Sequence, residues 1–292
     1  MAPINDTTRL RLALPKGRMQ AGVFKLLADA NITLRAGERD YRPVISLPGF
    51  DVKILKPQNI VEMLGTQARD IGFAGADWVA ELGADLVEML DTKLDPVRLV
   101  AAVPAELVQS GALKTSANLI VASEYERLTK NWISERGLQA KFLKSYGATE
   151  VFPPEDADCI IDNTSTGATL RSNNLEIIDD LMTSSTRLYV HPSVLDDPAR
   201  REQVENLVML LKSVLESRLR VMVELNVAPQ DLAAVVAALP CMREPTVSPL
   251  NGESGFAVRA AVLRSELASL IPSIKSIGGT DIVVTALAQI IP

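Results

Sequence analysis

The stretch best suited to chemistry is a short run of acid, hydroxyl and glycine residues after an apolar segment. It reads Asp162-Asn163-Thr164-Ser165-Thr166-Gly167-Ala168-Thr169 and directly follows Ile160 and Ile161. Successive backbone N–H groups in such a turn form a nest that holds an anion, and hydroxyl groups add donors. The pattern is typical of a site for a phosphate monoester. The same residue types also cap helices, so a plain helix-capping turn stays open as the alternative.

Two cations stand close together near the start of the chain. Lys16 and Arg18 occupy the turn Pro15-Lys16-Gly17-Arg18 after an apolar run. Arginine holds phosphate oxygens through its bidentate fork and lysine acts as a point charge, so the pair suits a triphosphate or a pyrophosphate. Taken alone, the pattern favours two solvated turn charges.

A third stretch combines glycines with acids. In Asp70-Ile71-Gly72-Phe73-Ala74-Gly75-Ala76-Asp77-Trp78 the glycines permit close approach of the backbone to a ligand. Asp77 is a candidate cleft residue, with a helix N-cap as the competing role. Lys56, before Pro57, is a further candidate cation, and Glu150 a further candidate carboxylate that a solvated position would also explain.

Several kinds of site are excluded by what the sequence lacks. His191 is the only histidine, which rules out a histidine-based triad or a histidine-rich metal site, and we interpret it as structural. Cys159 and Cys241 lie in unrelated contexts, so neither a disulfide framework nor a CxxC metal knuckle is expected. No GxxxxGK[ST] or GxGxxG pattern occurs, so ATP would not be bound as in P-loop or Rossmann proteins.

The elements that must position these residues alternate between strand and helix. Apolar runs at 10–14, 52–55 and 70–73 predict strands, with helical spacing after the first two. This alternation predicts an α/β layer with parallel strands. Strands predicted at 99–103, 119–122, 159–161 and 187–190, with a helix between 125 and 136, suit a second lobe and a return of the chain near residue 186. Clefts between lobes commonly bind small ligands.

The C-terminal part has a different pattern. Residues 196–218 have the spacing of a long amphipathic helix. After it, strands are predicted at 219–227, 246–250, 256–263 and 282–285, with helices at 231–239 and 267–277. The order β-α-β-β-α-β is ferredoxin-like.

Composition and charge limit the class of protein. The 292 residues are 47% hydrophobic and 23% charged, as in folded globular proteins, and the length favours more than one domain. A formal charge of -6 argues against a general nucleic-acid binder. No apolar run approaches the roughly 18 residues of a membrane span, and no secretory signal is visible. We therefore expect no nucleic-acid or membrane partner and a cytoplasmic location.

Three motifs resemble one family, the ATP phosphoribosyltransferases. The run from Asp162 to Leu170 is similar to their phosphoribosyl-pyrophosphate loop, and the Gly-x-x-Glu-x-x-Pro lead-in is matched by Gly147-Ala148-Thr149-Glu150-Val151-Phe152-Pro153. Leu14-Pro15-Lys16-Gly17-Arg18 is similar to the opening motif, and the stretch from Asp70 to Trp78 to the Asp-x-Gly-x-x-Gly-x-Asp segment. The resemblance extends over residues 9 to 291 and is to the long form of the family.

The resemblance implies an activity, a fold and a set of site residues. The activity is the first step of histidine biosynthesis, in which ATP condenses with 5-phosphoribosyl 1-pyrophosphate, with Mg²⁺ held mainly by substrate phosphates and by Asp162. The fold is α/β, a two-lobed periplasmic-binding-protein-like catalytic body plus a C-terminal ferredoxin-like (ACT-like) βαββαβ domain. Lobe I is 1–97 completed by 187–217, lobe II is 98–186, and the regulatory domain is 218–292. The catalytic residues would be Asp162, Lys16 and Arg18, and the substrate-binding residues Thr164, Ser165, Thr166, Gly167, Ala168, Thr169, Asp77, Lys56 and Glu150.

The C-terminal segment implies regulation. Its Leu239-to-Leu250 stretch resembles the domain found only in the long form, which implies inhibition by histidine and a homohexamer. The effector-binding residues would be Met242, Glu244, Thr246 and Ala257; a plain oligomerisation module is the alternative. The chain departs from the family at Asn163, where an aliphatic residue is usual, and at Asp281, where a small apolar residue is usual. A two-lobed small-molecule binding protein and a non-catalytic regulatory paralogue remain the alternative functions for the chain.

Overall fold

The computed structural model describes residues 9–35, 41–109, 112–113, 118–252 and 254–291. Two compact units result, one of residues 1–28 and 32–204 and the other of residues 29–31 and 205–292. The boundary falls inside helix α6 (Pro198–Leu219). Within the part of the chain that the structure describes, no helix combines the length and apolar character that a membrane span requires.

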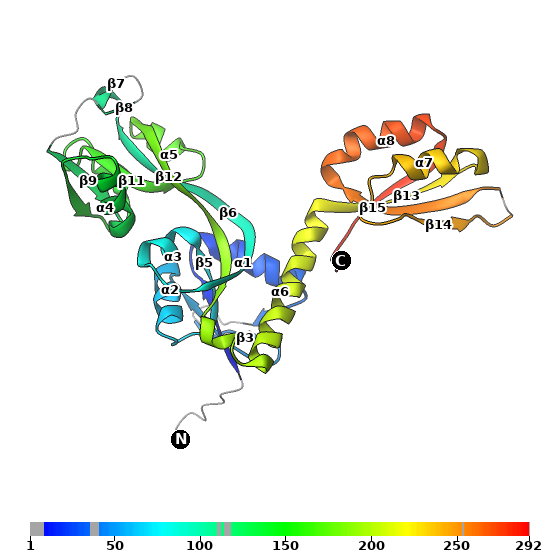
Figure 1. Cartoon of the computed structure of the whole chain (residues 1–292), viewed down its shortest axis with the longest axis horizontal. Helices are drawn as coiled ribbons and strands as arrows, with labels where there is room; N and C mark the ends of the chain where they lie inside the picture. The colour runs from blue at the N-terminus through cyan, green and yellow to red at the C-terminus, as the bar shows by residue number, and fades with distance from the viewer. Residues whose placement is uncertain (1–8, 36–40, 110–111, 114–117, 253, 292) are drawn as a thin grey trace. The chain divides into compact units, whose positions relative to one another are not determined.

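The first unit is built on one mixed eight-stranded sheet with the order β10-β9-β11-β6-β12-β5-β1-β4 (Figure 1). Its strands are β1 (Leu10–Pro15), β4 (Phe50–Leu55), β5 (Ile71–Gly75), β6 (Val87–Pro104), β9 (Leu119–Ser123), β10 (Ala140–Lys144), β11 (Cys159–Thr164) and β12 (Leu175–Val190). Its helices before α6 are α1 (Arg18–Asp29), α2 (Pro57–Gly65), α3 (Ala76–Leu82), α4 (Glu126–Glu135) and α5 (Ala168–Ser172). Two small ribbons pair β2 (Leu34–Arg35) with β3 (Val44–Ile45), and β7 (Val108–Gln109) with β8 (Ala112–Leu113).

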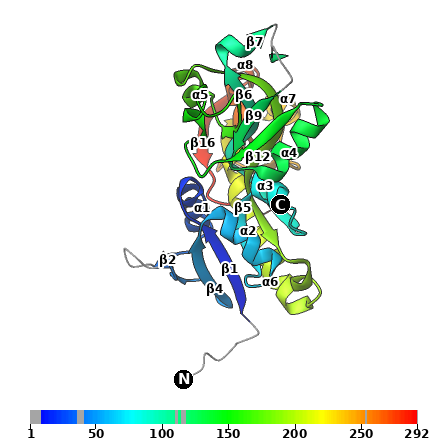
Figure 2. The same cartoon turned by 90° about the vertical axis from the view of Figure 1, so that its left-hand side faces the viewer.

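Two long strands join the two halves of this sheet. β6 and β12 pair with each other along their length, and they run antiparallel to β11 and β5 respectively. The parallel strands expected from the sequence are confirmed at both ends of the sheet: β1 is parallel to β4, which lies beside it in Figure 2, and to β5, and β9 is parallel to β10 and β11. The antiparallel centre of the sheet was not expected. A strand that carries the chain out to the second half and another that brings it back must run in opposite directions.

Each half of the sheet has its own core. In the half with β1 and β5, α2 places Ile60, Val61 and Leu64 against Ala13 and Ala74. In the other half, α4 buries Trp132 against a face of β6, β9 and β11. Trp78 packs against both clusters, so α3 lies where the two halves meet. The two-lobed α/β body expected from the sequence is confirmed.

The second unit contains the predicted βαββαβ domain. Its elements are β13 (Arg220–Val227), α7 (Leu232–Ala238), β14 (Thr246–Pro249), β15 (Phe256–Leu263), α8 (Leu267–Ser276) and β16 (Gly279–Ala286). The sheet order β14-β15-β13-β16 is the ferredoxin-like order. One face of β13 and β15 packs on α7 and α8 through alternating valines, among them Val221, Val223 and Val258. The ferredoxin-like expectation is confirmed.

Candidate functional site

The candidate site lies where strands of both halves end. The parallel strands β1, β4 and β5 end at Pro15, Leu55 and Gly75, and the parallel strands β9 and β11 end at Ser123 and Thr164. Open α/β sheets bind ligands at the carboxyl ends of their strands. The three candidate stretches of the sequence therefore lie at the edges where ligand binding is expected.

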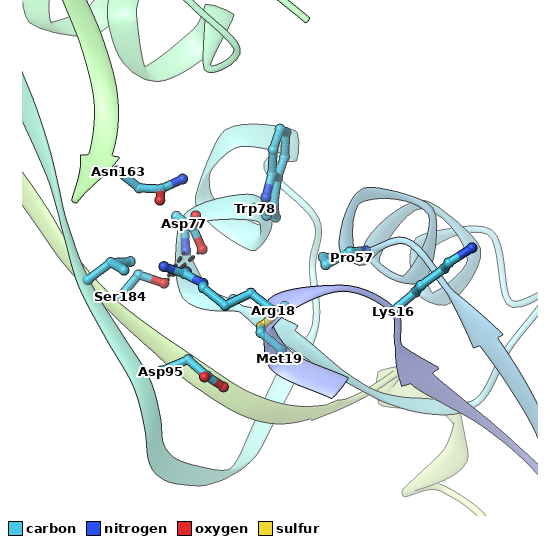
Figure 3. Close-up of a pocket in the computed structure, with 11 residues that line it drawn as sticks. Lys16, Arg18, Met19, Pro57, Asp77, Trp78, Asp95, Asn163 and Ser184 are labelled. Carbon is cyan, nitrogen blue, oxygen red and sulfur yellow. Dashed lines mark hydrogen bonds between the residues drawn. The ribbon is translucent and has the colours of Figure 1, made fainter. Parts of the chain in front are cut away.

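One pocket brings residues from both halves together (Figure 3). Its lining comes from the turn after β1, the start of α2, the junction of β5 with α3, the crossing strands and β11, and consists of Lys16, Arg18, Met19, Pro57, Gly75, Asp77, Trp78, Asp95, Val97, Asn163 and Ser184. Lys16, Arg18 and Asp77 were predicted from the sequence. Lys56 is the exposed N-cap residue of α2 and lies outside this lining, whereas Pro57 beside it contributes to it.

The two predicted cations are arranged differently. Both side chains are exposed. Lys16 Nζ donates a hydrogen bond of 2.9 Å to Tyr41 Oη and lies 4.8 Å from the centre of that ring. This ammonium group lowers the pKa of Tyr41. Figure 3 shows Arg18 extending from α1 toward Asp77 and Ser184, while Lys16 points away from them. Arg18 is thus the cation directed into the pocket.

Asp77 is held in a buried hydrogen-bond network. It is 5% exposed and lies in the first turn of α3, whose N-cap is Gly75, so the N-cap role is wrong. Its Oδ1 accepts from Ser184 Oγ at 2.7 Å, and its Oδ2 accepts from Tyr125 Oη at 2.6 Å. Asn163 Nδ2 donates to the same Tyr125 oxygen at 2.9 Å. A buried carboxylate requires such donors, and these come from the crossing strand and from the second half.

A second carboxylate of α3 also reaches the other half. Glu81, 8% exposed, accepts from the backbone N–H groups of Arg127 and Leu128, each at 3.0 Å. These are amides of the first turn of α4, which have no intrahelical partner. Glu81 therefore caps α4 from a helix of the opposite half, while Trp78 stacks on Tyr125 with ring centres 4.7 Å apart.

Asp162 has the most perturbed carboxyl of the candidate site. It lies in β11, two residues before the strand ends, because the strand continues beyond the apolar residues that predicted it. Burial raises its pKa to about 6; the Asn163 N–H bond opposes this, and the negative charges of Glu150 and Glu124 add to it. Glu150 is half-buried in a short 3-10 helix and acts on Asp162 through its charge. Strongly shifted carboxyls of this kind concentrate at functional sites.

The hydroxyl-rich loop leads into the N-terminus of α5. Thr164 Oγ1 accepts from Gly167 N at 2.9 Å and Thr166 Oγ1 accepts from Ala168 N at 3.4 Å, so the hydroxyls partly satisfy the loop's own amides. Among the described residues, the amides of Ser165 and Thr169 have no acceptor. Gly167 takes a φ of 73°, which favours glycine. An anion can therefore bind the free amides of Ser165 and Thr169 and compete with the two hydroxyls for the amides of Gly167 and Ala168.

Arg171 was missed by the sequence analysis. A Cβ placed on Gly167 would lie 2.8 Å from Arg171 Nη1, so this guanidinium folds back from α5 over the loop. The sequence pattern gave no signal for this residue, because its place beside Gly167 depends on the local fold of the loop. Tyr125, Ser184 and Glu81 were also missed, because their partners lie far away in the sequence.

His191 caps the short 3-10 helix Pro192–Val194. Its Nδ1 accepts from Ser193 N at 3.2 Å, and its Nε2 lies 3.3 Å from Gln67 Nε2. Among the described residues, no group of three or more His, Cys, Asp or Glu side chains could hold a metal ion. A metal at this site would therefore need ligands from a substrate.

The ferredoxin-like domain has a pocket of its own on the sheet face away from α7 and α8. It is lined by Glu224, Leu225, Asn226, Thr246, Ser248, Ala257, Val258, Arg259, Asp281 and Val283. Of the four predicted effector residues, Thr246 and Ala257 line it, while Met242 and Glu244 are exposed residues of the segment before β14. Asp281 takes a φ of 48° and accepts from Asn226 Nδ2 at 3.0 Å, and Arg259 pairs with Glu224 at 2.9 Å.

Comparisons with known proteins agree along the chain. The family model described as ATP phosphoribosyltransferase matches residues 56–213, and that described as HisG, C-terminal domain, matches residues 218–289. A protein named ATP phosphoribosyltransferase from Pelotomaculum thermopropionicum is 35% identical, with 97% of this chain and 100% of the relative covered. One of the same name from Chlorobium phaeovibrioides is 33% identical, with 95% and 96% covered.

One solved structure is also similar. It is the ATP phosphoribosyl transferase (HisG:HisZ) complex from Thermotoga maritima, of which one chain superimposes with a TM-score of 0.63 at 25% sequence identity. The match covers 71% of this chain and 98% of that chain.

Proposed function

Because the chain belongs to the ATP phosphoribosyltransferase family of histidine biosynthesis, we propose that its cleft joins N1 of the adenine of ATP to C1 of 5-phosphoribosyl 1-pyrophosphate. The products are N1-(5-phosphoribosyl)-ATP and pyrophosphate. The observation that carries this assignment is the pairing of an anion-binding loop at the end of β11 with the cations Lys16 and Arg18 after β1.

The loop from Thr164 to Thr169 binds the 5'-phosphate. The free amides of Ser165 and Thr169 and the start of α5 supply the donors, and the Arg171 guanidinium beside Gly167 adds positive charge. Asp162, as a carboxylate, accepts hydrogen bonds from the ribose hydroxyls. Glu150 adjoins Asp162 and keeps this end of the cleft negative.

The pocket beside this loop meets the leaving group and the nucleotide phosphates, and Asn163 is the residue of the β11 end that lines it. Neutral adenine N1 has a lone pair, so its attack on C1 needs no general base. The protein must instead align two anionic substrates and stabilise the charge on the departing pyrophosphate. Arg18 points into the pocket, Lys16 also lines it, and Lys56 precedes Pro57, which lines it. Asp77 holds Ser184 and Tyr125 in position through its hydrogen bonds.

Mg²⁺ is the cofactor that these residues fit. The described residues contain no all-protein cage, and Mg²⁺ commonly binds through substrate phosphates with one or two carboxylates. Asp162 and Glu150 are the carboxylates that would hold it. When bound, the ion neutralises charge on the pyrophosphate oxygens.

The C-terminal domain, 218–292, is a regulatory domain that binds histidine. Its pocket carries both charge signs, with Glu224 and Asp281 near Arg259, which suits an amino-acid zwitterion. Asp281, the departure from the family pattern, adds an acceptor for an ammonium or imidazolium group. We further propose that the protein is a homohexamer, which light scattering of the purified protein tests directly. We also propose a cytoplasmic location.

The proposed activity is tested with ATP, phosphoribosyl pyrophosphate and Mg²⁺. Adduct formation changes the absorbance of the purine, and a coupled assay counts the pyrophosphate released. We expect equal amounts of both products, and inhibition when histidine is added. Binding of both substrates without adduct would instead indicate a small-molecule binding protein or a non-catalytic regulatory paralogue.

A further inference from the structure

The amide of Asn163 has only one orientation that satisfies its neighbours. Tyr125 is fully buried, and burial first, then the charge of Asp77, raises the pKa of its hydroxyl far above the ordinary value. The hydroxyl therefore keeps its proton. That proton goes to Asp77 Oδ2, 2.6 Å away, because a carboxylate only accepts hydrogen bonds.

The Tyr125 oxygen is then left with lone pairs only. Asn163 must offer its NH₂ group to that oxygen, and the two atoms lie 2.9 Å apart. A flipped amide would place its carbonyl oxygen against an oxygen whose proton is already used. The chain Asp77–Tyr125–Asn163 thus fixes which end of the amide faces away from Tyr125, and that end is the carbonyl.

The carbonyl of Asn163 is available to a ligand. Asn163 lines the pocket and is half-buried, and none of the described residues donates a hydrogen bond to its Oδ1. Figure 3 shows the amide projecting from the β11 side toward Asp77. Met19, Pro57 and Trp78 supply apolar surface in the same pocket, as a flat heterocycle requires.

The position of Asn163 in the chain places this acceptor at the reacting edge. It lies between Asp162 and Thr164, the residues proposed to meet the ribose and to begin the phosphate loop. The adenine atom that attacks the ribose is N1, and the exocyclic 6-amino group is attached to the adjacent carbon. A base with N1 directed at C1 therefore presents its amino group to residues beside Asp162.

We propose that Asn163 Oδ1 accepts a hydrogen bond from the 6-amino group of the adenine and selects adenine over purines that lack this donor. The inference rests on the proposed function and adds the residue that reads the base. A 6-oxo purine would set its own oxygen against the carbonyl, so guanine and hypoxanthine nucleotides are rejected.

The bond should strengthen during the reaction. The N1 lone pair forms the N1–C1 bond while the C1–O bond breaks, and pyrophosphate leaves with that electron pair. The ring gains a positive charge that it shares with the 6-amino group, whose hydrogens become better donors until one proton is released to water. An acceptor that binds more tightly in the transition state raises kcat as well as affinity.

The test compares ATP with purine riboside 5'-triphosphate, which has no 6-amino group. Asn163→Leu should lower kcat/KM for ATP by about 10- to 100-fold, the range for a hydrogen bond to a group that becomes charged. The inhibition constant of the analogue against ATP should change by less than about threefold, because the analogue never makes this bond. Tyr125→Phe frees the amide to rotate and should give a smaller loss with ATP.

Asn131→Leu is the matched control, since Asn131 is an exposed residue of α4, and it should change neither quantity. Equal weakening of ATP and the analogue in Asn163→Leu would overturn the role of Asn163, as would unchanged kcat/KM for ATP. Absence of adduct from ATP with the unmodified protein would contradict the proposed function itself, so the two failures are distinguishable.

Discussion

Replacing Asp162 with asparagine should make the protein more stable and inactive at the same time. Burial raises the pKa of this carboxyl from its ordinary value of 3.8 to about 6. At about 1.36 kcal/mol per unit, this shift corresponds to about 3 kcal/mol, and we reduce it to the order of 1–2 kcal/mol because Asp162 is half-buried and partly screened by solvent. The substituted amide carries no charge to desolvate, and its side-chain oxygen can still accept from the backbone N–H of Asn163, as the carboxylate does.

The sign of the effect depends on pH. Because the folded pKa lies above the unfolded one, the favourable contribution of the neutral carboxyl is fully present below pH 3.8 and is lost as the pH rises through about 6. Asp162→Asn should therefore exceed the unmodified protein in stability by the full amount at pH 8. At pH 4.5 the difference should fall to about a third of that amount.

The assay is urea unfolding at both pH values, together with turnover at pH 8. Turnover should drop at least about 100-fold, because the ribose hydroxyls lose a charged acceptor in the transition state. In the unmodified enzyme, kcat/KM for phosphoribosyl pyrophosphate should decline below pH about 6 as the carboxylate is protonated. A variant that is less stable at pH 8 would contradict the unfavourable burial of the Asp162 charge, and one that turns over normally would contradict its contact with the ribose.

Gly167→Val should raise KM for phosphoribosyl pyrophosphate at least about tenfold, because φ is 73° and a Cβ would lie 2.8 Å from Arg171 Nη1; Gly65→Ala, with open space around it, is the control, and equal kinetics in both would count against the loop. Glu81→Ala removes the acceptor of two α4 amides and should lower the free energy of unfolding by about 1–2 kcal/mol, measured by calorimetry. An unchanged melting temperature would contradict the capping role of Glu81. Ala257→Leu fills the effector pocket and should weaken inhibition by histidine at least about tenfold; identical inhibition curves would move the effector site elsewhere.

Much of the architecture could be predicted because the pattern of apolar residues is local. The run 10–14 and the alternation in β13 and β15 are each typical of one type of element, and the βαββαβ order follows from their sequence. The length of β6 could not be predicted. Only residues 99–103 form a continuous apolar run, because the longer part of the strand before them is interrupted by charged residues, among them Lys93, Asp95 and Arg98.

The residues of the site also fall into two groups, those that a local pattern predicts and those that depend on distant parts of the chain. Lys16, Arg18 and the loop after Asp162 were visible because each follows a recognisable strand. The roles of Tyr125 and Glu81 were not, since their partners are 48 and 46 residues away or more and depend on how α3 meets α4. Nothing in the local pattern states that Asp77 is a buried acceptor and not a helix cap.

A crystal structure with phosphoribosyl pyrophosphate and Mg²⁺ would show whether the loop from Thr164 to Thr169 binds the 5'-phosphate. We expect the 5'-phosphate within hydrogen-bond distance of the amides of residues 164–169, with the Thr164 hydroxyl displaced from Gly167 N and the ribose hydroxyls against Asp162. A phosphate bound elsewhere, with this loop unchanged and its own hydroxyl contacts intact, would show that the loop is not the phosphate site.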